Sequence, residues 1–366
     1  MEKLDSAVIL KTIHRTLKTA RLFDVFWERW LVHGLDENDL QKARSHIHSL
    51  EGWYMTWADL AEIKEQKGKE LEALNNMREA EKTYRQTALY YNLNYWIDPS
   101  YSKAKKEWYQ KSVHFMKKAD SLSDSKTIYK KLSLNDQSLC SGRIRVPKNP
   151  QGVIIIVNPI DSTKEELYLY EMDFLQKGFI TMSFDGPGQG ETFVVNGVTG
   201  TRVRWESFIH QVIEYANKSY PDLPIHLFGT SLAASWVLYG SSHKYVEKAV
   251  AVSPAVELDR MNMPGYFMKR MECSCIVDDK DEEETERSIP KFTEIKYRAP
   301  VLVFYGSQDM MITKNEFSRL YKNISSEKSL VEYEEEGHVC NRKLKEIRDT
   351  ACSWFTGEFN MKEAQS

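Results

Sequence analysis

Six short apolar runs, each separated from the next by a longer stretch, occupy the part of the chain after residue 150. They are Val153–Val157, Phe179–Phe184, Ile225–Phe228, Lys248–Val252, Val301–Tyr305 and Leu330–Tyr333. Runs this apolar are typical of strands that are covered on both faces, and their alternation with helical stretches predicts a mainly parallel, doubly wound sheet. Ligands of such sheets bind at the carboxyl ends of the strands. We therefore expect the chemistry of this protein in the turns that follow the runs.

The first third of the chain has a different pattern. Residues 1–141 contain three of the 17 glycines and one of the 11 prolines, which favours long helices. Apolar residues recur at helical spacing in the segments 22–30, 53–63, 71–95 and 101–116, and Pro99 separates the last two. We expect an all-helical cap domain over residues 1–125 and an α/β domain over residues 126–366. The second domain should open with an antiparallel pair of strands at 127–134 and 139–146.

One apolar run is followed directly by Gly229-Thr230-Ser231-Leu232-Ala233. A strand, a sharp turn and a helix at this point would place the Ser231 hydroxyl at the carboxyl edge of the sheet, beside the first N–H groups of the helix. Gly229 is the small residue that such a turn needs, whereas Ala233 stands where the usual G-x-S-x-G pattern has a second glycine. The alternative is a buried serine that opens an ordinary helix.

A serine nucleophile requires a base, and an acid that orients the base. Asp309 follows the run 301–305 and His338 follows the run 330–333, so both come after expected carboxyl ends of strands. Serine, acid and histidine in this order is a known arrangement of such residues along a chain. The sequence therefore predicts Ser231, Asp309 and His338 as catalytic residues.

The oxyanion of an acyl-transfer intermediate needs two N–H donors. Leu232, which follows the nucleophile, would supply one donor, and the turn after the run 153–157 would supply the other. Pro159 in that turn has no N–H, so Ile160 is the candidate. Asp161 and Lys164 in the same turn are expected to pair and hold the loop.

Aromatic residues gather before the helix break, at Tyr90, Tyr91, Tyr95 and Trp96. The plain interpretation is that they pack helices together; the sharper hypothesis is that they bind substrate as one wall of a pocket under the helical domain. The longest interruption between apolar runs, residues 257–298, holds several methionines that suit an adaptable apolar pocket. Insertions of this length are commonly lids, and we expect a lid here.

Composition narrows the class of partner. A formal net charge of −3 provides no field to attract nucleic acid, and no stretch of about 18 apolar residues could span a membrane. The N-terminus lacks the features of a signal peptide, so we expect a cytoplasmic protein with a small-molecule substrate. Five cysteines, an odd number, favour free thiols, and the pair Cys273 and Cys275 has no further metal ligands at suitable spacing. The glycines at 186–190 lack the spacing of a nucleotide-binding loop. From the cysteines and the glycines together we expect no metal and no cofactor.

Three motifs, Asp161–Glu165, Phe184–Glu191 and Gly229–Ser231, together resemble the α/β-hydrolase superfamily. The similarity is greatest to its branch with an N-terminal helical domain, which includes FrsA-like proteins, 2,6-dihydroxypseudooxynicotine hydrolase and fungal hydrolases, and it covers roughly residues 70–366. The resemblance implies the α/β-hydrolase fold, a triad of Ser231, Asp309 and His338, a pocket between helical domain and sheet, and often a homodimer.

The same branch includes esterases and enzymes that hydrolyse a carbon–carbon bond next to a ketone. Some carry an extra acidic residue after the strand that here ends at Ser253, and Glu257 and Asp259 are the substrate-binding candidates for that place. The chain departs from the branch at Asn158-Pro159, where relatives commonly have glycines, and at Ala233. These departures concern the shape of the oxyanion loop more than the triad.

These observations predict a serine hydrolase that cleaves an ester, or a ketone-adjacent carbon–carbon bond, of a small organic molecule such as a secondary metabolite. Two alternatives stay open: a carbon–carbon bond hydrolase of polyketide or diketone type, and a non-catalytic binding or regulatory protein on the same fold. A peptidase with an N-terminal gating domain is disfavoured, because no propeller-like repeat is present.

Overall fold

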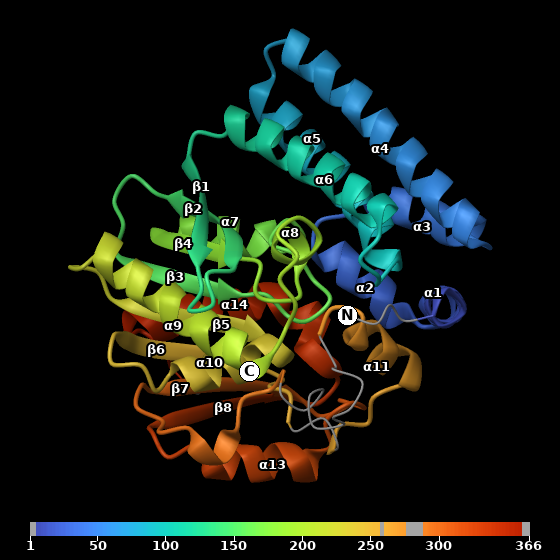
Figure 1. Ribbon diagram of the computed structural model, residues 1–366. Helices are drawn as coiled ribbons and strands as arrows, with labels where there is room; N and C mark the ends of the chain where they lie inside the picture. The colour runs from blue at the N-terminus through green and yellow to red at the C-terminus, as the bar shows by residue number, and fades with distance from the viewer. Residues whose placement is uncertain (1–4, 257–259, 276–287, 361–366) are drawn as a thin grey trace.

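Six helices form the first part of the chain. The computed structural model describes residues 5–256, 260–275 and 288–360, and Figure 1 labels its elements. The helices are α1 (Ser6–Leu22), α2 (Asp24–Val32), α3 (Glu37–His46), α4 (Leu50–Ala73), α5 (Met77–Ile97) and α6 (Lys103–Leu122). Hydroxyl caps start two of them: Ser49 accepts from the N–H of Gly52, and Ser102 from that of Lys105.

The expected helical segment 71–95 is divided between two helices. α4 ends at Ala73 and α5 begins at Met77, and Asn75 between them has a left-handed backbone with φ 58°. Asparagine tolerates this conformation better than most residues, which explains why the chain turns here without glycine or proline. The next break lies where Pro99 predicts it: α5 ends at Ile97.

The core of the helical region is built from tryptophan. Trp30 of α2 lies edge-on to the indoles of Trp27, Trp53, Trp57 and Trp96, with ring centroids between 5.2 and 6.4 Å apart. Such pairs contribute about 0.5–1.5 kcal/mol each beyond the burial of their area. This cluster fixes the position of α2, which contributes side chains to the candidate active site.

The rest of the chain builds one eight-stranded sheet. Its strands are β1 (Lys126–Ser133), β2 (Leu139–Val146), β3 (Gly152–Val157), β4 (Phe179–Phe184), β5 (Ile225–Thr230), β6 (Val246–Val252), β7 (Val301–Gly306) and β8 (Lys328–Tyr333). The order across the sheet is β1-β2-β4-β3-β5-β6-β7-β8. β2 is antiparallel to β1 and β4, and all other neighbours are parallel. The predicted parallel sheet with an antiparallel opening is confirmed.

Each face of the sheet has its own core, because alternate side chains of a strand point to opposite faces. In β3, Val153, Ile155 and Val157 join a core with α9 (Arg202–Ser219) and α10 (Leu232–Gly240). Ile154 and Ile156 join a core with α7 (Tyr168–Gln176) and α14 (Leu344–Thr356) on the other face. The sheet is therefore covered on both sides, as Figure 1 shows.

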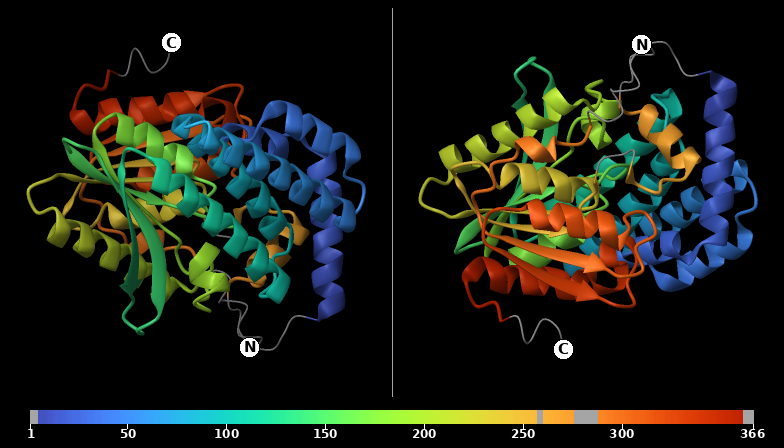
Figure 2. Two further views of the ribbon diagram at one scale, coloured as in Figure 1. Left: turned by 90° about the horizontal axis from the view of Figure 1, so that it is seen from above. Right: turned by 90° about the horizontal axis from the view of Figure 1, so that it is seen from below.

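Helices α1–α6, drawn in blue to cyan in Figure 2, lie together at one side of the sheet. The remaining short elements of the described residues are α8 (Gly190–Val194), α11 (Gly265–Glu272), α13 (Lys314–Asn323) and the 3₁₀ helices η2 (Phe292–Glu294) and η3 (His338–Lys343). α1 packs on α11, α6 on α8, and α2 on η3. Since η3 follows the carboxyl end of β8, this last contact brings α2 to the edge of the sheet where the site was expected. Of the expected lid at 257–298, the described part contains α11 and η2.

Candidate active site

Ser231 occupies a strained turn between β5 and α10. Its backbone has φ 56° and ψ −128°, a conformation that costs free energy for a residue with a side chain. A Cβ at Gly229 would lie 2.9 Å from the backbone of Ala233, so only glycine lets α10 pass this close to β5. Ala233 is fully buried and fits in place of a second glycine. The strand, turn and helix predicted around Ser231 are present.

Ser231, His338 and Asp309 form a continuous series of hydrogen bonds. The Ser231 hydroxyl donates to Nε2 of His338 over 2.8 Å, and Nδ1–H of His338 donates to Oδ2 of Asp309 over 2.7 Å. The other oxygen of Asp309 accepts from the backbone N–H groups of Met311 and Ile312 at 2.9 and 3.0 Å. These contacts fix the carboxylate, which fixes the tautomer and orientation of the imidazole so that Nε2 can accept a proton from the serine.

The turn that carries His338 is held by a second serine. The N–H of Val339 donates to Oγ of Ser253 over 3.1 Å, and Ser253 directly follows β6. Val339, Cys340 and Ser253 all have positive φ, of 72°, 52° and 46°. The backbone is thus strained on both sides of this hydrogen bond. Such strain persists only where the surrounding structure holds the residues in place, so the position of His338 is well fixed.

The loop after β3 is held by Gln189. Its side-chain amide donates to the carbonyl oxygens of Asn158 and Pro159 at 2.9 and 2.8 Å, and its oxygen accepts from the N–H of Gly186 at 2.9 Å. A trans peptide unit is planar, so the Pro159 carbonyl and the Ile160 N–H point in opposite directions. Gln189 therefore fixes the direction of the N–H that sequence reasoning assigned to the oxyanion. Sequence reasoning missed this residue.

The expected pair of Asp161 and Lys164 is wrong. Asp161 pairs with Arg270 of α11 at 2.9 Å, whereas Lys164 lies 2.8 Å from Asp185. Asp161 has a positive φ of 64°. Its carboxylate is the counter-charge of the buried guanidinium of Arg270. Asp161 and Arg270 are 109 residues apart and Lys164 and Asp185 are 21 apart, so no pattern within the turn predicts either pair.

A cavity of about 150 Å³ lies next to Ser231 and His338. Leu232 and Ile160, the predicted oxyanion donors, both line it, and most of its wall is apolar. Three of the methionines in the predicted lid belong to the wall, namely Met261, Met263 and Met271. α2 supplies Val25, Phe26 and Arg29, and His33 directly follows this helix; the sequence did not single out any of the four as pocket residues.

The four aromatic residues predicted as a pocket wall do not line this cavity. Tyr90, Tyr91, Tyr95 and Trp96 are buried in the core of the helical region. Trp96 packs behind Phe26, with ring centroids 5.8 Å apart, so it supports the wall without reaching the cavity. α5 packs between other helices, which is why its aromatic residues form core. Glu257 and Asp259 lie outside the described residues.

Comparison with known proteins identifies the architecture. The crystal structure of 2,6-dihydroxy-pseudo-oxynicotine hydrolase matches 93% of this chain and 97% of its own, with a TM-score of 0.76 at 18% identity. The chain has the α/β-hydrolase fold. No protein-family profile matches it.

Two curated sequence relatives carry hydrolase names. The 2,6-dihydropseudooxynicotine hydrolase of Paenarthrobacter nicotinovorans is 26% identical over 58% of this chain and 57% of its own. The 20-hydroxy-prefusarin hydrolase FUS2 of Gibberella moniliformis is 27% identical over 60% of this chain and 56% of its own. The chain therefore spans somewhat more than half the length of these relatives. The predicted resemblance to this group of α/β hydrolases is confirmed.

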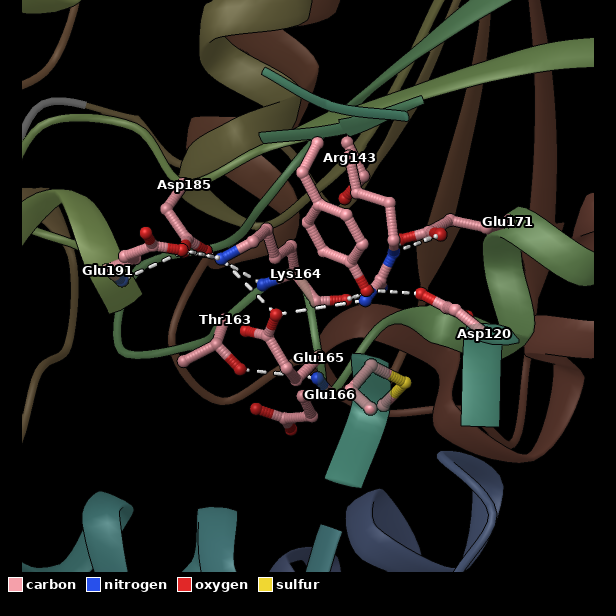
Figure 3. A network of polar contacts seen from close by, with 12 residues as sticks. Asp120, Arg143, Thr163, Lys164, Glu165, Glu166, Glu171, Asp185 and Glu191 are labelled. Carbon is pink, nitrogen blue, oxygen red and sulfur yellow. Dashed lines mark hydrogen bonds and ion pairs between the residues drawn. The ribbon is translucent and has the colours of Figure 1, made fainter. Parts of the chain in front are cut away.

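Within the hydrolase fold, a buried ionic network surrounds the loop that follows β3 (Figure 3). Lys164 of this loop pairs with Asp185 and Glu191, at 2.8 and 3.1 Å. Tyr109 of α6 donates to Glu165 and Asp185 at 2.5 and 2.9 Å. Burial opposes the charge of Lys164, but Asp185 and Glu165 hold its pKa above the ordinary value. The network ties α6 of the helical region to the loop that follows β3.

The same network continues into the antiparallel edge of the sheet. Arg143 and Arg145 of β2 each lie 2.7 Å from Glu171 of α7, and Arg145 also lies 2.7 Å from Asp120 of α6. All four side chains are almost completely buried. Removing one partner of such a set leaves a buried charge uncompensated, so these residues hold the layers in one arrangement.

Among the described residues, one group has ligand atoms close enough for an ion, formed by His210, Glu214 and His243 within 4.8 Å of one another. None of the three lines the cavity. All five cysteines are unpaired. In the described part of the chain no helix combines the length and the apolar character that crossing a membrane requires.

Proposed function

We propose that this protein is a serine hydrolase that cleaves an ester, or a carbon–carbon bond next to a ketone, in a small and mainly apolar organic molecule. The observation that supports it is the hydrogen-bonded series Asp309, His338 and Ser231 at the wall of an apolar cavity. The hydrolase names of the relatives agree with this proposal.

In the proposed reaction, Ser231 Oγ attacks the substrate carbonyl while Nε2 of His338 takes its proton. Asp309 stabilises the imidazolium that results. The N–H groups of Leu232 and Ile160 hold the oxyanion. His338 then gives the proton to the leaving group, and a water molecule, activated by the same imidazole, hydrolyses the acyl-enzyme and restores Ser231.

Ester hydrolysis is the simpler of the two reactions. An alcohol leaving group needs only the proton of His338, whereas cleavage of a carbon–carbon bond releases a carbanion that needs an adjacent carbonyl to accept its charge. The resemblance to ketone-cleaving hydrolases keeps the second reaction as an alternative. The remaining alternative is a non-catalytic binding protein. Under this alternative we expect that the serine at the cavity does not react with a fluorophosphonate probe.

We further propose that residues 1–125 serve as a cap on an α/β catalytic domain formed by residues 126–366. The contribution of α2 to the cavity wall supports this role. A homodimer, a cytoplasmic location and the absence of nucleic-acid partners stay predictions. Sedimentation of the purified protein tests the first of them.

A fluorophosphonate probe tests the proposed nucleophile, because it reacts only with activated serines. The purified protein is treated with the probe and the adduct is located by peptide mass spectrometry. We expect the adduct on Ser231, and its loss in Ser231→Ala and His338→Ala. Ser219→Ala, which changes an exposed serine at the end of α9, is the matched control and should keep the adduct.

The same experiment separates the alternatives. An adduct that needs both Ser231 and His338 supports a hydrolase, and product analysis with esters and with diketones then decides between the two reactions. A folded protein that stays unlabelled even by the smallest phosphonyl fluoride would contradict the proposal and favour a binding protein.

A further inference from the structure

Polar side chains interrupt the mainly apolar wall of the cavity at several places, and Asn341 and Arg29 are two of them. The first, Asn341 of η3, lies three residues after His338. Asn341 is 8% exposed and lines the cavity, and its side-chain amide makes no hydrogen bond with any described residue. An amide without a protein partner at the wall of a cavity can form hydrogen bonds with a molecule that enters the cavity.

The second side chain is Arg29 of α2, which lines the same cavity. Its Nε and Nη2 bind the two oxygens of Glu166 at 2.7 and 2.9 Å, and Nη2 also donates to the carbonyl oxygen of Asp161 at 3.2 Å. Nη1 has no hydrogen bond to a residue in the described ranges, although the side chain is only 20% exposed. One nitrogen of the guanidinium thus stays available for a ligand.

The surrounding groups decide which ligand charge fits. Burial opposes the charge of Arg29, but Glu166 holds its pKa above the ordinary value. Burial lowers the pKa of His33, which therefore stays neutral and donates from Nδ1 to Glu166 over 2.9 Å. Tyr170 donates to the other ring nitrogen of His33 over 3.2 Å.

The charge of Arg29 is thus balanced by Glu166, and that of Asp161 by Arg270. An added carboxylate would have no unpaired cation to neutralise it, and burying an unpaired charge is costly. A neutral oxygen, which accepts hydrogen bonds without bringing a charge, fits this part of the wall.

We propose that Arg29 and Asn341 form a subsite for a neutral oxygen function of the substrate, a ketone or a hydroxyl, separate from the carbonyl that Ser231 attacks. This inference rests on the proposed function and narrows its substrate class to mainly apolar molecules with at least two oxygen functions. Arg29 offers a donor, and the Asn341 amide offers both donor and acceptor. Groups that would otherwise lack partners then gain them from substrate.

Matched esters test the subsite. Phenyl levulinate and phenyl valerate differ only in a ketone that replaces one methylene of the acyl chain. The butyrates of para-acetylphenol and para-ethylphenol place the same difference in the leaving group. For each pair the ratio of kcat/KM, ketone over hydrocarbon, is measured in wild type, Asn341→Leu and Arg29→Met. The two esters of a pair also differ in intrinsic reactivity, but this difference is the same in every protein. It therefore cancels when the ratio in a variant is compared with the ratio in wild type.

We expect the ratio for at least one pair to fall about tenfold in both variants, as the loss of one hydrogen bond to a buried partner predicts. Met263→Leu, a change in the apolar wall, should keep the wild-type ratio. Arg29→Met also removes the counter-charge of Glu166 and could prevent folding. Asn341→Leu leaves the pair of Arg29 and Glu166 intact, so this variant tests the subsite if Arg29→Met does not fold.

Ratios in Asn341→Leu equal to those of wild type in both pairs would overturn the subsite while leaving the hydrolase intact. Failure of the wild-type protein to hydrolyse any of the four esters, together with an unlabelled Ser231, would overturn the proposed function and the subsite with it. The two failures are therefore distinguishable.

Discussion

The side-chain amide of Gln189 donates to the carbonyl oxygen of Pro159 over 2.8 Å. This carbonyl belongs to the same peptide unit as the N–H of Ile160, so the bond fixes the direction of a proposed oxyanion donor. The neighbouring bond to Asn158, at 2.9 Å, prevents the loop from rotating as a whole. A glutamine in the glycine-rich turn after β4 thereby acts on the loop after β3.

Replacing Gln189 should therefore lower kcat with little change in KM. We expect Gln189→Leu to reduce kcat of ester hydrolysis about tenfold to hundredfold, less than the complete loss of an oxyanion donor, which costs about 10²–10³. Gln189→Glu keeps the acceptor for Gly186 but loses both donors, so it should show the same loss. A rise in KM at constant kcat in either variant would contradict the positioning role, and thermal denaturation checks that both variants are folded.

Asp309→Asn should reduce kcat about 10⁴-fold while leaving the protein folded. The amide can no longer accept from Nδ1–H of His338 as a carboxylate does, so the imidazole is held in the wrong tautomer and its cationic form is not stabilised. Steady-state kinetics with phenyl valerate measure this loss. Asp349→Asn, on the exposed face of α14 where Asp349 pairs with Lys345, is the control and should keep wild-type rates. Retention of a tenth of the activity by Asp309→Asn would count against the proposed role.

Lys164→Met should destabilise the protein by about 3–5 kcal/mol, because Asp185, which pairs with Lys164 at 2.8 Å, would remain buried without this cation. Urea denaturation monitored by tryptophan fluorescence measures this change. Lys345→Met is the matched control: it removes a lysine from a pair whose side chains are 60% and 44% exposed, and exposed pairs contribute at most about 1 kcal/mol. Equal stability of the two variants would show that the network does not hold the layers.

Local patterns and the order of the elements along the chain were enough to predict the sheet and the proximity of three side chains. The runs at β3, β4, β5 and β7 are buried along their whole length, so their apolar character is visible without tertiary information. Ser231, Asp309 and His338 follow strands whose carboxyl ends share one edge, so the topology brings them together. Their catalytic role stays a prediction.

The wall of the cavity could not be predicted in the same way. Tyr90 and Trp96 look like pocket residues because they precede a helix break, but α5 packs between other helices and buries them. Phe26 and Arg29 lie on a short helix with no distinctive motif, and they reach the cavity only because α2 packs on η3. Contacts between helices distant in sequence set these positions.

His226 of β5 should make the protein less stable in acid. Its side chain is 1% exposed and stacks on Phe355, with ring centroids 4.5 Å apart. Burial, and the nearby charge of Lys248, lower the pKa of His226 to about 3. In the unfolded chain the pKa of histidine is about 6.5. Below that pH the unfolded state binds a proton that the native state does not, so the free energy of unfolding falls as the pH drops towards 3.

The slope attributable to His226 is about 1.4 kcal/mol per pH unit, or about 3 kcal/mol between pH 6.5 and pH 4. In His226→Phe this contribution disappears, because phenylalanine fills a similar volume and binds no proton. Urea denaturation of both proteins at several pH values between 4 and 8 should therefore show that wild type loses about 3 kcal/mol of stability relative to His226→Phe between pH 7 and pH 4. His14→Ala, at an exposed position of α1, should retain the wild-type slope. Parallel curves for wild type and His226→Phe would mean that the buried imidazole takes up its proton in the native state without cost.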